Sequence, residues 1–233
     1  MGALPTAKAI ALWRQSDAVC FDVDSTVLPH EGIDRLALHC GAAEQVAEWT
    51  KRAMTGKVLF EQALQARLEL IQPTRMQLDQ VSNQPIELTP GVEFLVKELK
   101  ARDVAVYLVS GGFRSMITPI AHRLGLDPET NVFANRILFH DDENETFRGF
   151  DGDEPTSKSG GKPRVIETLM NREGFQRITM IGDGVTDMEA RPPAHLFIGF
   201  GGIVQRAPVQ QGADWFVESF QPLVESLSPI STE

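Results

Sequence analysis

Residues 18–26 read Ala-Val-Cys-Phe-Asp-Val-Asp-Ser-Thr, and this stretch decides the fold that we predict. Its four apolar residues are typical of a buried strand, and Asp22 and Asp24 follow where that strand ends. In an open α/β sheet, ligands bind at the carboxyl ends of the strands. Two buried carboxylates so close together favour a divalent metal site, because a buried charge needs a partner. An Asp-rich turn after a strand is the simpler alternative.

The composition sets broad limits on the function. A chain of 233 residues with 42% hydrophobic residues is long enough for one α/β domain with a small insertion. The net charge of −10, without a long basic run, argues against nucleic acid or an anionic membrane surface as a partner. Cys20 and Cys40 form no disulfide framework, which favours a reducing compartment. No apolar stretch is long enough to span a membrane.

Apolar strands alternate with helices along most of the chain. We expect buried strands at residues 18–21, 104–109, 177–181, 196–199 and 215–217, and a hairpin formed by residues 132–139 and 146–150. Between about residues 31 and 84, every pattern is helical. These patterns predict a doubly wound, Rossmann-like parallel sheet made by residues 1–28 and 86–233, a helical-bundle cap inserted at residues 29–85, and a β-hairpin at about residues 132–150.

Three of the predicted strands end in polar or glycine-rich residues. The first ends at Asp22 and Asp24, the second at Ser110, and the third at Asp183. Because parallel strands linked by helices bring their carboxyl ends to one edge of the sheet, we expect these residues to converge. The three carboxylates suit Mg²⁺, which prefers oxygen ligands.

A second group of residues suits an anion. Ser110 offers a hydroxyl, Gly111 and Gly112 offer backbone N–H groups before a helix, and Lys162 offers a positive charge. Together with a metal they would surround a phosphoryl group, with a carboxylate as the nucleophile. Each piece has a simpler explanation on its own, namely a tight turn at Ser110, a solvated lysine at Lys162 and an ordinary strand-to-helix turn at Asp183.

The order of these segments resembles the motif series of the haloacid-dehalogenase-like phosphohydrolases, and within them the phosphoserine phosphatase family. The segments that carry the resemblance are Asp-Val-Asp-Ser-Thr at 22–26, Glu-Gly-Ile-Asp at 31–34, Ser-Gly-Gly-Phe-Arg at 110–114, Asn-Val-Phe-Ala-Asn at 131–135, Ser-Gly-Gly-Lys at 159–162 and Gly-Asp-Gly-Val-Thr-Asp at 182–187. The resemblance covers nearly the whole chain. It implies Mg²⁺-dependent hydrolysis of O-phospho-L-serine to L-serine and phosphate through an aspartyl-phosphate, the last step of the phosphorylated pathway of serine biosynthesis.

The resemblance also implies the role of each catalytic residue. Asp22 attacks phosphorus, while Asp24 first protonates the departing serine oxygen and then takes a proton from water. Mg²⁺ is bound by Asp22, by Asp183 and by the backbone carbonyl of Asp24. Ser110 and Lys162 bind the phosphoryl oxygens in the transition state.

Substrate selection is expected in the inserted helical cap. By resemblance, Glu31 binds the amine of the substrate and Arg67 its carboxylate, whereas a capping acid and a solvated arginine are the simpler alternatives. The remaining predicted substrate-binding residues are Met54, Thr55, Phe60, Gly111, Gly112 and Thr186, and Asp187 is expected beside the metal ligands. Thr55 replaces a glycine that is common in the family, and Thr186 stands where some relatives carry asparagine.

Two other functions stay open at this stage. One is a related phosphatase or phosphotransferase for another small phosphate that resembles an amino acid, and the other is a binding protein without activity on the same fold. The expected partner is a small-molecule substrate, phosphoserine, and neither nucleic acid nor a membrane is expected. The protein is expected to be a monomer or a homodimer. The expected location is the cytoplasm, or the plastid stroma if this is a processed plant or algal form.

Overall fold

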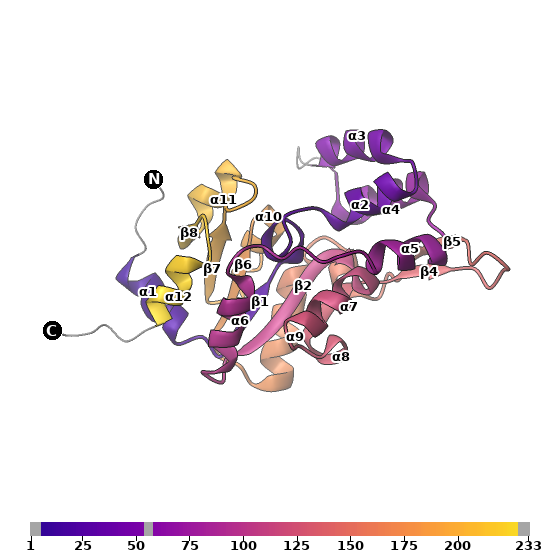
Figure 1. Cartoon of the computed structure of the whole chain (residues 1–233). Helices are drawn as coiled ribbons and strands as arrows, with labels where there is room; N and C mark the ends of the chain where they lie inside the picture. The colour runs from indigo at the N-terminus through magenta and orange to yellow at the C-terminus, as the bar shows by residue number, and fades with distance from the viewer. Residues whose placement is uncertain (1–5, 54–57, 228–233) are drawn as a thin grey trace. The chain divides into compact units, whose positions relative to one another are not determined.

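The structure of the protein is a computed structural model that describes residues 6–53 and 58–227. Its main feature is a six-stranded sheet (Figure 1). The strand order is β3-β2-β1-β6-β7-β8. The strands are β1 (Ala18–Phe21), β2 (Ala105–Phe113), β3 (Val132–Asn135), β6 (Ile178–Gly182), β7 (Leu196–Phe200) and β8 (Trp215–Val217). The pairs β1–β2, β1–β6, β6–β7 and β7–β8 are parallel, so the predicted Rossmann-like parallel sheet is confirmed.

Continuous apolar runs form the central strands because both faces of a parallel sheet are covered. Every residue of β1, β6, β7 and β8 is buried. The fully buried aromatic rings of Phe21, Phe200 and Phe220 pack against one another, Phe200 stacked on Phe220 and Phe21 edge-on to it.

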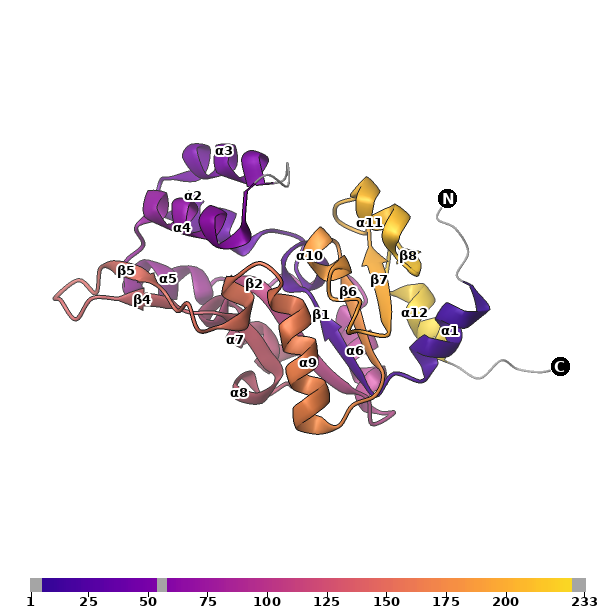
Figure 2. The same ribbon diagram turned by 180° about the vertical axis from the view of Figure 1, so that it is seen from behind.

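The chain divides into two compact units, and the first comprises Met1–Pro29, Glu87–Leu108 and Lys162–Glu233. Its helices are α1 (Ala7–Arg14), α6 (Val92–Lys100), α9 (which begins at Gly161 and ends at Glu173), α10 (Val185–Met188), α11 (Ala207–Gly212) and α12 (Gln221–Leu227). The helices α6 and α9 lie on opposite faces of the sheet (Figures 1 and 2). The indole nitrogen of Trp13 on α1 donates to the backbone oxygen of Leu223 on α12 over 3.1 Å, which joins these two helices.

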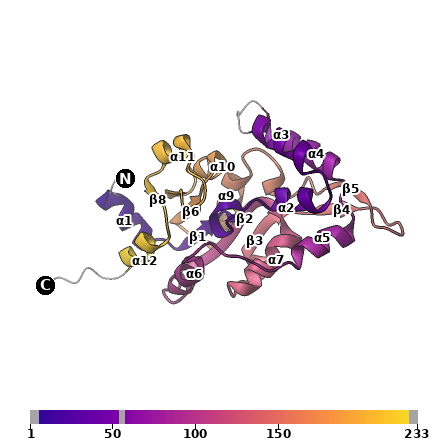
Figure 3. The same ribbon diagram turned by 45° about the horizontal axis from the view of Figure 1, so that its top comes forward.

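The second unit comprises His30–Ile86 and Val109–Gly161. Its helices are α2 (Gly32–His39), α3 (Ala43–Ala53), α4 (Phe60–Ile71), α5 (Arg75–Ser82), α7 (Arg114–Arg123) and α8 (Pro128–Asn131). The helices α3 and α4 lie side by side (Figure 3). Apolar residues at helical spacing, such as Leu64 and Leu68 on α4, form one core with Leu36, Phe113 and Ile137. The division predicted from the sequence, a core of 1–28 and 86–233 with a cap of 29–85, stays a prediction.

Two predicted strand boundaries are wrong. Strand β2 does not stop at Ser110 but continues to Phe113, because Gly111 and Gly112 adopt extended backbone within the strand. The apolar run of residues 132–139 forms two strands rather than one. Its first part, β3, joins the large sheet, and only β4 (Ile137–Phe139) pairs with β5 (Phe147–Phe150) in the antiparallel hairpin.

Two expectations about the class of protein can also be compared with the structure. Cys20 and Cys40 are both free thiols. Within residues 6–53 and 58–227, none of the helices has the length and apolar character that crossing a membrane requires.

Candidate active site

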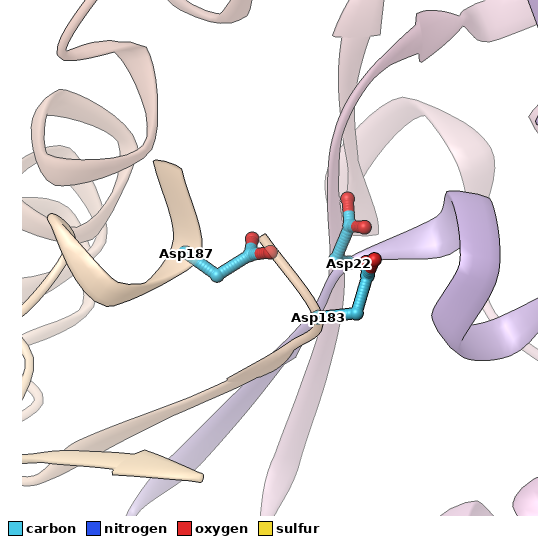
Figure 4. Close-up of side chains that lie close together, drawn as sticks. All are labelled: Asp22, Asp183 and Asp187. Carbon is cyan, nitrogen blue, oxygen red and sulfur yellow. The ribbon is translucent and has the colours of Figure 1, made fainter. Parts of the chain in front are cut away.

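Three buried carboxylates lie together in the first unit. Asp22 follows β1, Asp183 follows β6 and Asp187 belongs to α10, and one oxygen of each carboxylate lies within 4.8 Å of the others. Figure 4 shows Asp187 reaching from its helix toward the other two side chains. The group brings together residues that are more than 160 positions apart in the sequence.

The pairing of β1 with β6 explains why these carboxylates meet. Phe21 and Ile181 are register partners, and the backbone N–H of Asp22 donates to the oxygen of Ile181 over 2.9 Å. The next residue on β6 must be glycine, because a Cβ on Gly182 would lie 2.2 Å from Cγ of Asp187. The Asp-containing motif at residues 182–187 therefore has a direct steric reason.

Lys162 supplies one of the cationic side chains of this site. Its Nζ donates to Oδ1 of Asp22 over 2.6 Å and also to Oδ1 of Asp187. Burial alone would lower the pKa of the lysine, but the carboxylates of Asp187 and Asp22 outweigh burial and hold this pKa above its usual value. The simpler explanation for Lys162, a solvated surface lysine, is wrong.

Asp183 has two further partners that the sequence did not reveal. Arg206 donates to Oδ2 of Asp183 from Nε over 2.9 Å and from Nη2 over 2.8 Å, and Thr26 Oγ1 lies 3.4 Å from Oδ1. Arg206 lies 23 residues after Asp183, just before α11, and no motif marks it. The sequence offered only a general expectation, namely that a buried carboxylate such as that of Asp183 needs a cationic partner.

The charges of the site fit a divalent cation. Three buried carboxylates face two cationic side chains, those of Lys162 and Arg206, so negative charge is in excess. Burial raises the pKa of Asp187, and the carboxylates of Asp22 and Asp183 raise it further against the opposing effect of Lys162. Since grouped carboxylate oxygens suit a hard divalent cation, the residues present fit such a metal ion.

Asp24 and Thr186 also lie in the first unit, but neither is a member of the group of three carboxylates. Asp24 belongs to the turn at residues 23–27, in which Ser25 takes a left-handed conformation with φ of 56°. Its side chain is partly exposed, and its carboxylate is not a member of the group formed by Asp22, Asp183 and Asp187. Thr186 is exposed in the first turn of α10.

The remaining predicted residues belong to the second unit. Ser110 is completely buried, and its Oγ accepts the N–H of Gly112 over 2.9 Å. That hydroxyl can still donate its own hydrogen to an anion, whereas the N–H of Gly112 is already used. Gly111 contacts Phe60 so closely that an added Cβ would lie 2.7 Å from Cζ of the ring.

The two residues predicted to bind the amine and the carboxylate of the substrate lie in this unit, Glu31 just before α2 and Arg67 on α4. Glu31 occupies the N-cap position of α2, but its side chain makes no capping hydrogen bond, which counts against the simpler alternative. Arg67 is half-buried on α4, where its Nε donates to the oxygen of Ala63 over 3.0 Å. Met54 and Thr55 lie outside the described residues.

Comparison with known proteins identifies relatives in one family of hydrolases. A family model described as haloacid dehalogenase-like hydrolase matches residues 16–194. Human phosphoserine phosphatase is 51% identical over 93% of this chain and 95% of its own length. The chloroplastic phosphoserine phosphatase of Arabidopsis thaliana is 48% identical over 96% of this chain and 76% of its own length.

Solved structures share the fold. A structure titled as a phospho-aspartyl intermediate analogue of phosphoserine phosphatase superposes with a TM-score of 0.78 and 30% identity, covering 91% of this chain and 98% of that one. The structure of DsGPDH of Dunaliella salina superposes with a TM-score of 0.84 and 36% identity, and this chain spans 38% of it. The family model, the curated relatives and the solved structures agree, and the chain belongs to the phosphoserine phosphatases of the haloacid dehalogenase-like hydrolase family.

Proposed function

We propose that the protein hydrolyses O-phospho-L-serine to L-serine and phosphate, with Mg²⁺ and through an aspartyl-phosphate on Asp22. The observation that carries this proposal is the buried group of Asp22, Asp183 and Asp187 with Lys162 bound to two of its members. By the family resemblance, this reaction ends the phosphorylated pathway of serine biosynthesis. The expected compartments are the cytoplasm and the plastid stroma, and the name of the Arabidopsis relative places that protein in the chloroplast.

The metal would be held by Asp22, by Asp183 and by the backbone carbonyl of Asp24. When bound, Mg²⁺ offsets negative charge on the phosphoryl oxygens and orients the phosphoryl group. The excess of carboxylates over cations in the site supports this assignment. Asp187 then serves chiefly to hold Lys162, since their side chains form a direct ion pair.

The first half of the reaction transfers the phosphoryl group to the protein. A carboxylate oxygen of Asp22 forms a bond to phosphorus as the bond between phosphorus and the serine oxygen breaks. Lys162, which donates to Oδ1 of Asp22, orients this carboxylate and offsets charge on the phosphoryl oxygens. The carboxyl of Asp24 gives its proton to the departing serine oxygen.

The second half of the reaction restores Asp22. The Asp24 carboxylate now takes a proton from a water molecule, which attacks phosphorus while the bond from phosphorus to Asp22 breaks. Inorganic phosphate leaves, and Asp24 is protonated again for the next substrate. Two easier steps thus replace the direct hydrolysis of a phosphate monoester, which is among the slowest reactions without a catalyst.

Selection of phosphoserine is assigned to the second unit. Glu31 would bind the ammonium group of the substrate and Arg67 its carboxylate, while Phe60 packs against Gly111 beside Ser110. The half-buried setting of Arg67 supports this role, because a guanidinium in such a setting binds a carboxylate through two parallel hydrogen bonds.

Phosphate release from purified protein tests the proposal. We expect turnover of O-phospho-L-serine with Mg²⁺, loss of turnover with a chelator, and much lower efficiency with phosphoethanolamine, which lacks the carboxylate. Equal catalytic efficiency with both substrates would contradict the assignment of phosphoserine as the substrate and favour a related phosphatase for another small phosphate. Asp22→Asn should abolish phosphate release, while the circular dichroism spectrum of this variant stays that of the wild type. Wild-type turnover in this variant would refute the role of Asp22 as the nucleophile.

A further inference from the structure

Helix α4 lacks a local N-cap. The residue before it is Leu59, whose side chain cannot accept a hydrogen bond from the first backbone N–H groups of the helix. Serine, threonine, aspartate or asparagine would be the usual residue at this position. The helix that carries Phe60 and Arg67 therefore depends on another part of the chain to satisfy its first turn.

Ser159 supplies that cap from almost 100 residues away. Its Oγ accepts the N–H of Phe60 over 3.1 Å, and in return Oε2 of Glu61 accepts the N–H of Ser159 over 3.0 Å and its hydroxyl over 2.9 Å. Glu61 also lies in the first turn of α4, where the helix dipole favours a negative charge. The three hydrogen bonds form a reciprocal contact between α4 and the loop at residues 155–161.

The loop that carries Ser159 is itself tightly held. Gly160 has φ of 70°, and a Cβ on Gly161 would lie 2.3 Å from the backbone oxygen of Pro155, so both positions require glycine. Thr156 Oγ1 donates to Oδ1 of the buried Asn135 over 2.9 Å. The loop is thus the fixed partner of the contact with α4.

The same loop is connected to the glycine that Phe60 touches. Nδ2 of Asn135 donates to the backbone oxygen of Gly111 over 2.8 Å, and Phe60 packs against the same glycine. The contacts form a closed ring that runs from Gly111 through Asn135, the loop and Ser159 to Phe60 and back to Gly111. Displacement of Ser159 from α4 would open this ring at its most exposed point.

We propose that Ser159 and Glu61 are positioning residues that fix the start of α4, and with it Phe60 and Arg67, for recognition of the serine part of the substrate. The inference rests on the proposed function, since it concerns how the same substrate is held. Neither residue touches the reacting atoms. Because Phe60 and Arg67 would hold the substrate equally in the ground state and the transition state, loss of the contact raises KM and leaves kcat nearly unchanged.

Steady-state kinetics of Ser159→Ala and Glu61→Ala test this assignment. For phosphoserine we expect KM to rise about fivefold in each variant, the loss typical of partly exposed hydrogen bonds, with kcat within about twofold of the wild type. Phenyl phosphate, which has neither ammonium nor carboxylate, should be turned over as efficiently as by the wild type. The double variant should resemble either single one, and Ser159→Thr, which keeps the hydroxyl, should restore the wild-type KM.

A matched control is Glu69→Ala, which removes another glutamate from α4. In the contacts described, the Glu69 carboxylate accepts a hydrogen bond only from Gln65 on the same helix. This control should keep the wild-type KM. The inference is overturned if Ser159→Ala and Glu61→Ala leave KM unchanged, or if they lower efficiency equally for both substrates together with Tm. If the wild type does not turn over phosphoserine at all, the proposed function fails instead, so the two failures are distinguishable.

Discussion

At the scale of the residue, the closest constraint in the site is the contact between Gly182 and Asp187. The carboxylate of Asp187 occupies the space where a side chain at position 182 would lie, and its Oδ2 accepts the N–H of Gly184 over 2.9 Å. Lys162 reaches the same carboxylate. A single methyl group at position 182 would therefore displace a member of the ion-pair group.

We expect Gly182→Ala to abolish phosphoserine turnover and to lower Tm, because Asp187 can no longer hold Lys162 where it lies now. The cost should be about 3 kcal/mol in unfolding free energy, as for other broken buried ion pairs. Urea unfolding and phosphate release measure both effects. Gly152→Ala is the control, since a Cβ there meets nothing within 4 Å. Wild-type activity in Gly182→Ala would contradict the described geometry.

The convergence of the carboxylates was predictable from the sequence where motifs mark it. Asp22 and Asp183 end apolar runs, and the parallel-sheet rule places such ends together. Arg206 was not predictable, because it comes from a loop and its spacing from Asp183 follows no pattern. The use of the Gly112 N–H by Ser110 was missed for a similar reason, since a hydrogen bond between residues two positions apart leaves no trace in composition.

At the scale of the element, Asp17 joins the starts of three strands. Its side chain accepts the N–H groups of Gln176 and Arg177 just before β6, over 2.9 and 2.8 Å, and pairs with the Arg177 guanidinium. Its backbone accepts the N–H of Ala105 at the start of β2. Burial acts to raise the pKa of Asp17, but the hydrogen bonds from Arg177 and Gln176 outweigh it and hold this pKa below its usual value.

This direction fixes the pH dependence that Asp17 contributes. A carboxyl whose pKa is lowered by folding adds stability above its unfolded pKa, and this stability is lost as the pH falls through the folded pKa. We expect Asp17→Asn to cost about 1 kcal/mol in unfolding free energy at pH 7 and progressively less below about pH 4. Urea unfolding across this range measures the difference. A difference for Asp17→Asn that grows on acidification would contradict the assignment.

The elements themselves were predictable where periodicity is strong. The buried strands β1, β6, β7 and β8 and the helices of residues 30–86 follow from apolar runs and helical spacing. The end of β2 was not predictable, because two glycines usually mark a turn and here continue a strand. The strand β3 was assigned to the hairpin, since nothing in residues 132–139 marks the change of sheet at Arg136.

At the scale of the whole molecule, the uncompensated charge of the site links metal binding to stability. Three buried carboxylates face only two cationic side chains, so a bound divalent cation would reduce the repulsion that remains among them. A ligand that binds only the folded state stabilises it by mass action, about 2.7 kcal/mol at 100 times its Kd. Metal content should therefore be visible in the stability of the entire protein.

We expect saturating Mg²⁺ to raise Tm by about 5–10 °C over the chelated protein, as that free energy implies for a chain of this size. Differential scanning calorimetry at two metal concentrations measures the shift. In Asp183→Asn, which removes one of the proposed metal ligands, most of the shift should disappear. A shift of the same size in this variant would place the metal elsewhere.

In the proposed reaction, Asp22 carries the phosphoryl group between the two halves. The most direct test is to mix the enzyme with phosphoserine and Mg²⁺, quench with acid within the first turnover, and map phosphorylation by peptide mass spectrometry. We expect an acid-stable phosphoryl group on Asp22 that hydroxylamine removes, and no such group in Asp22→Asn. Steady release of phosphate by the wild type without label on Asp22, or label on another residue, would contradict it.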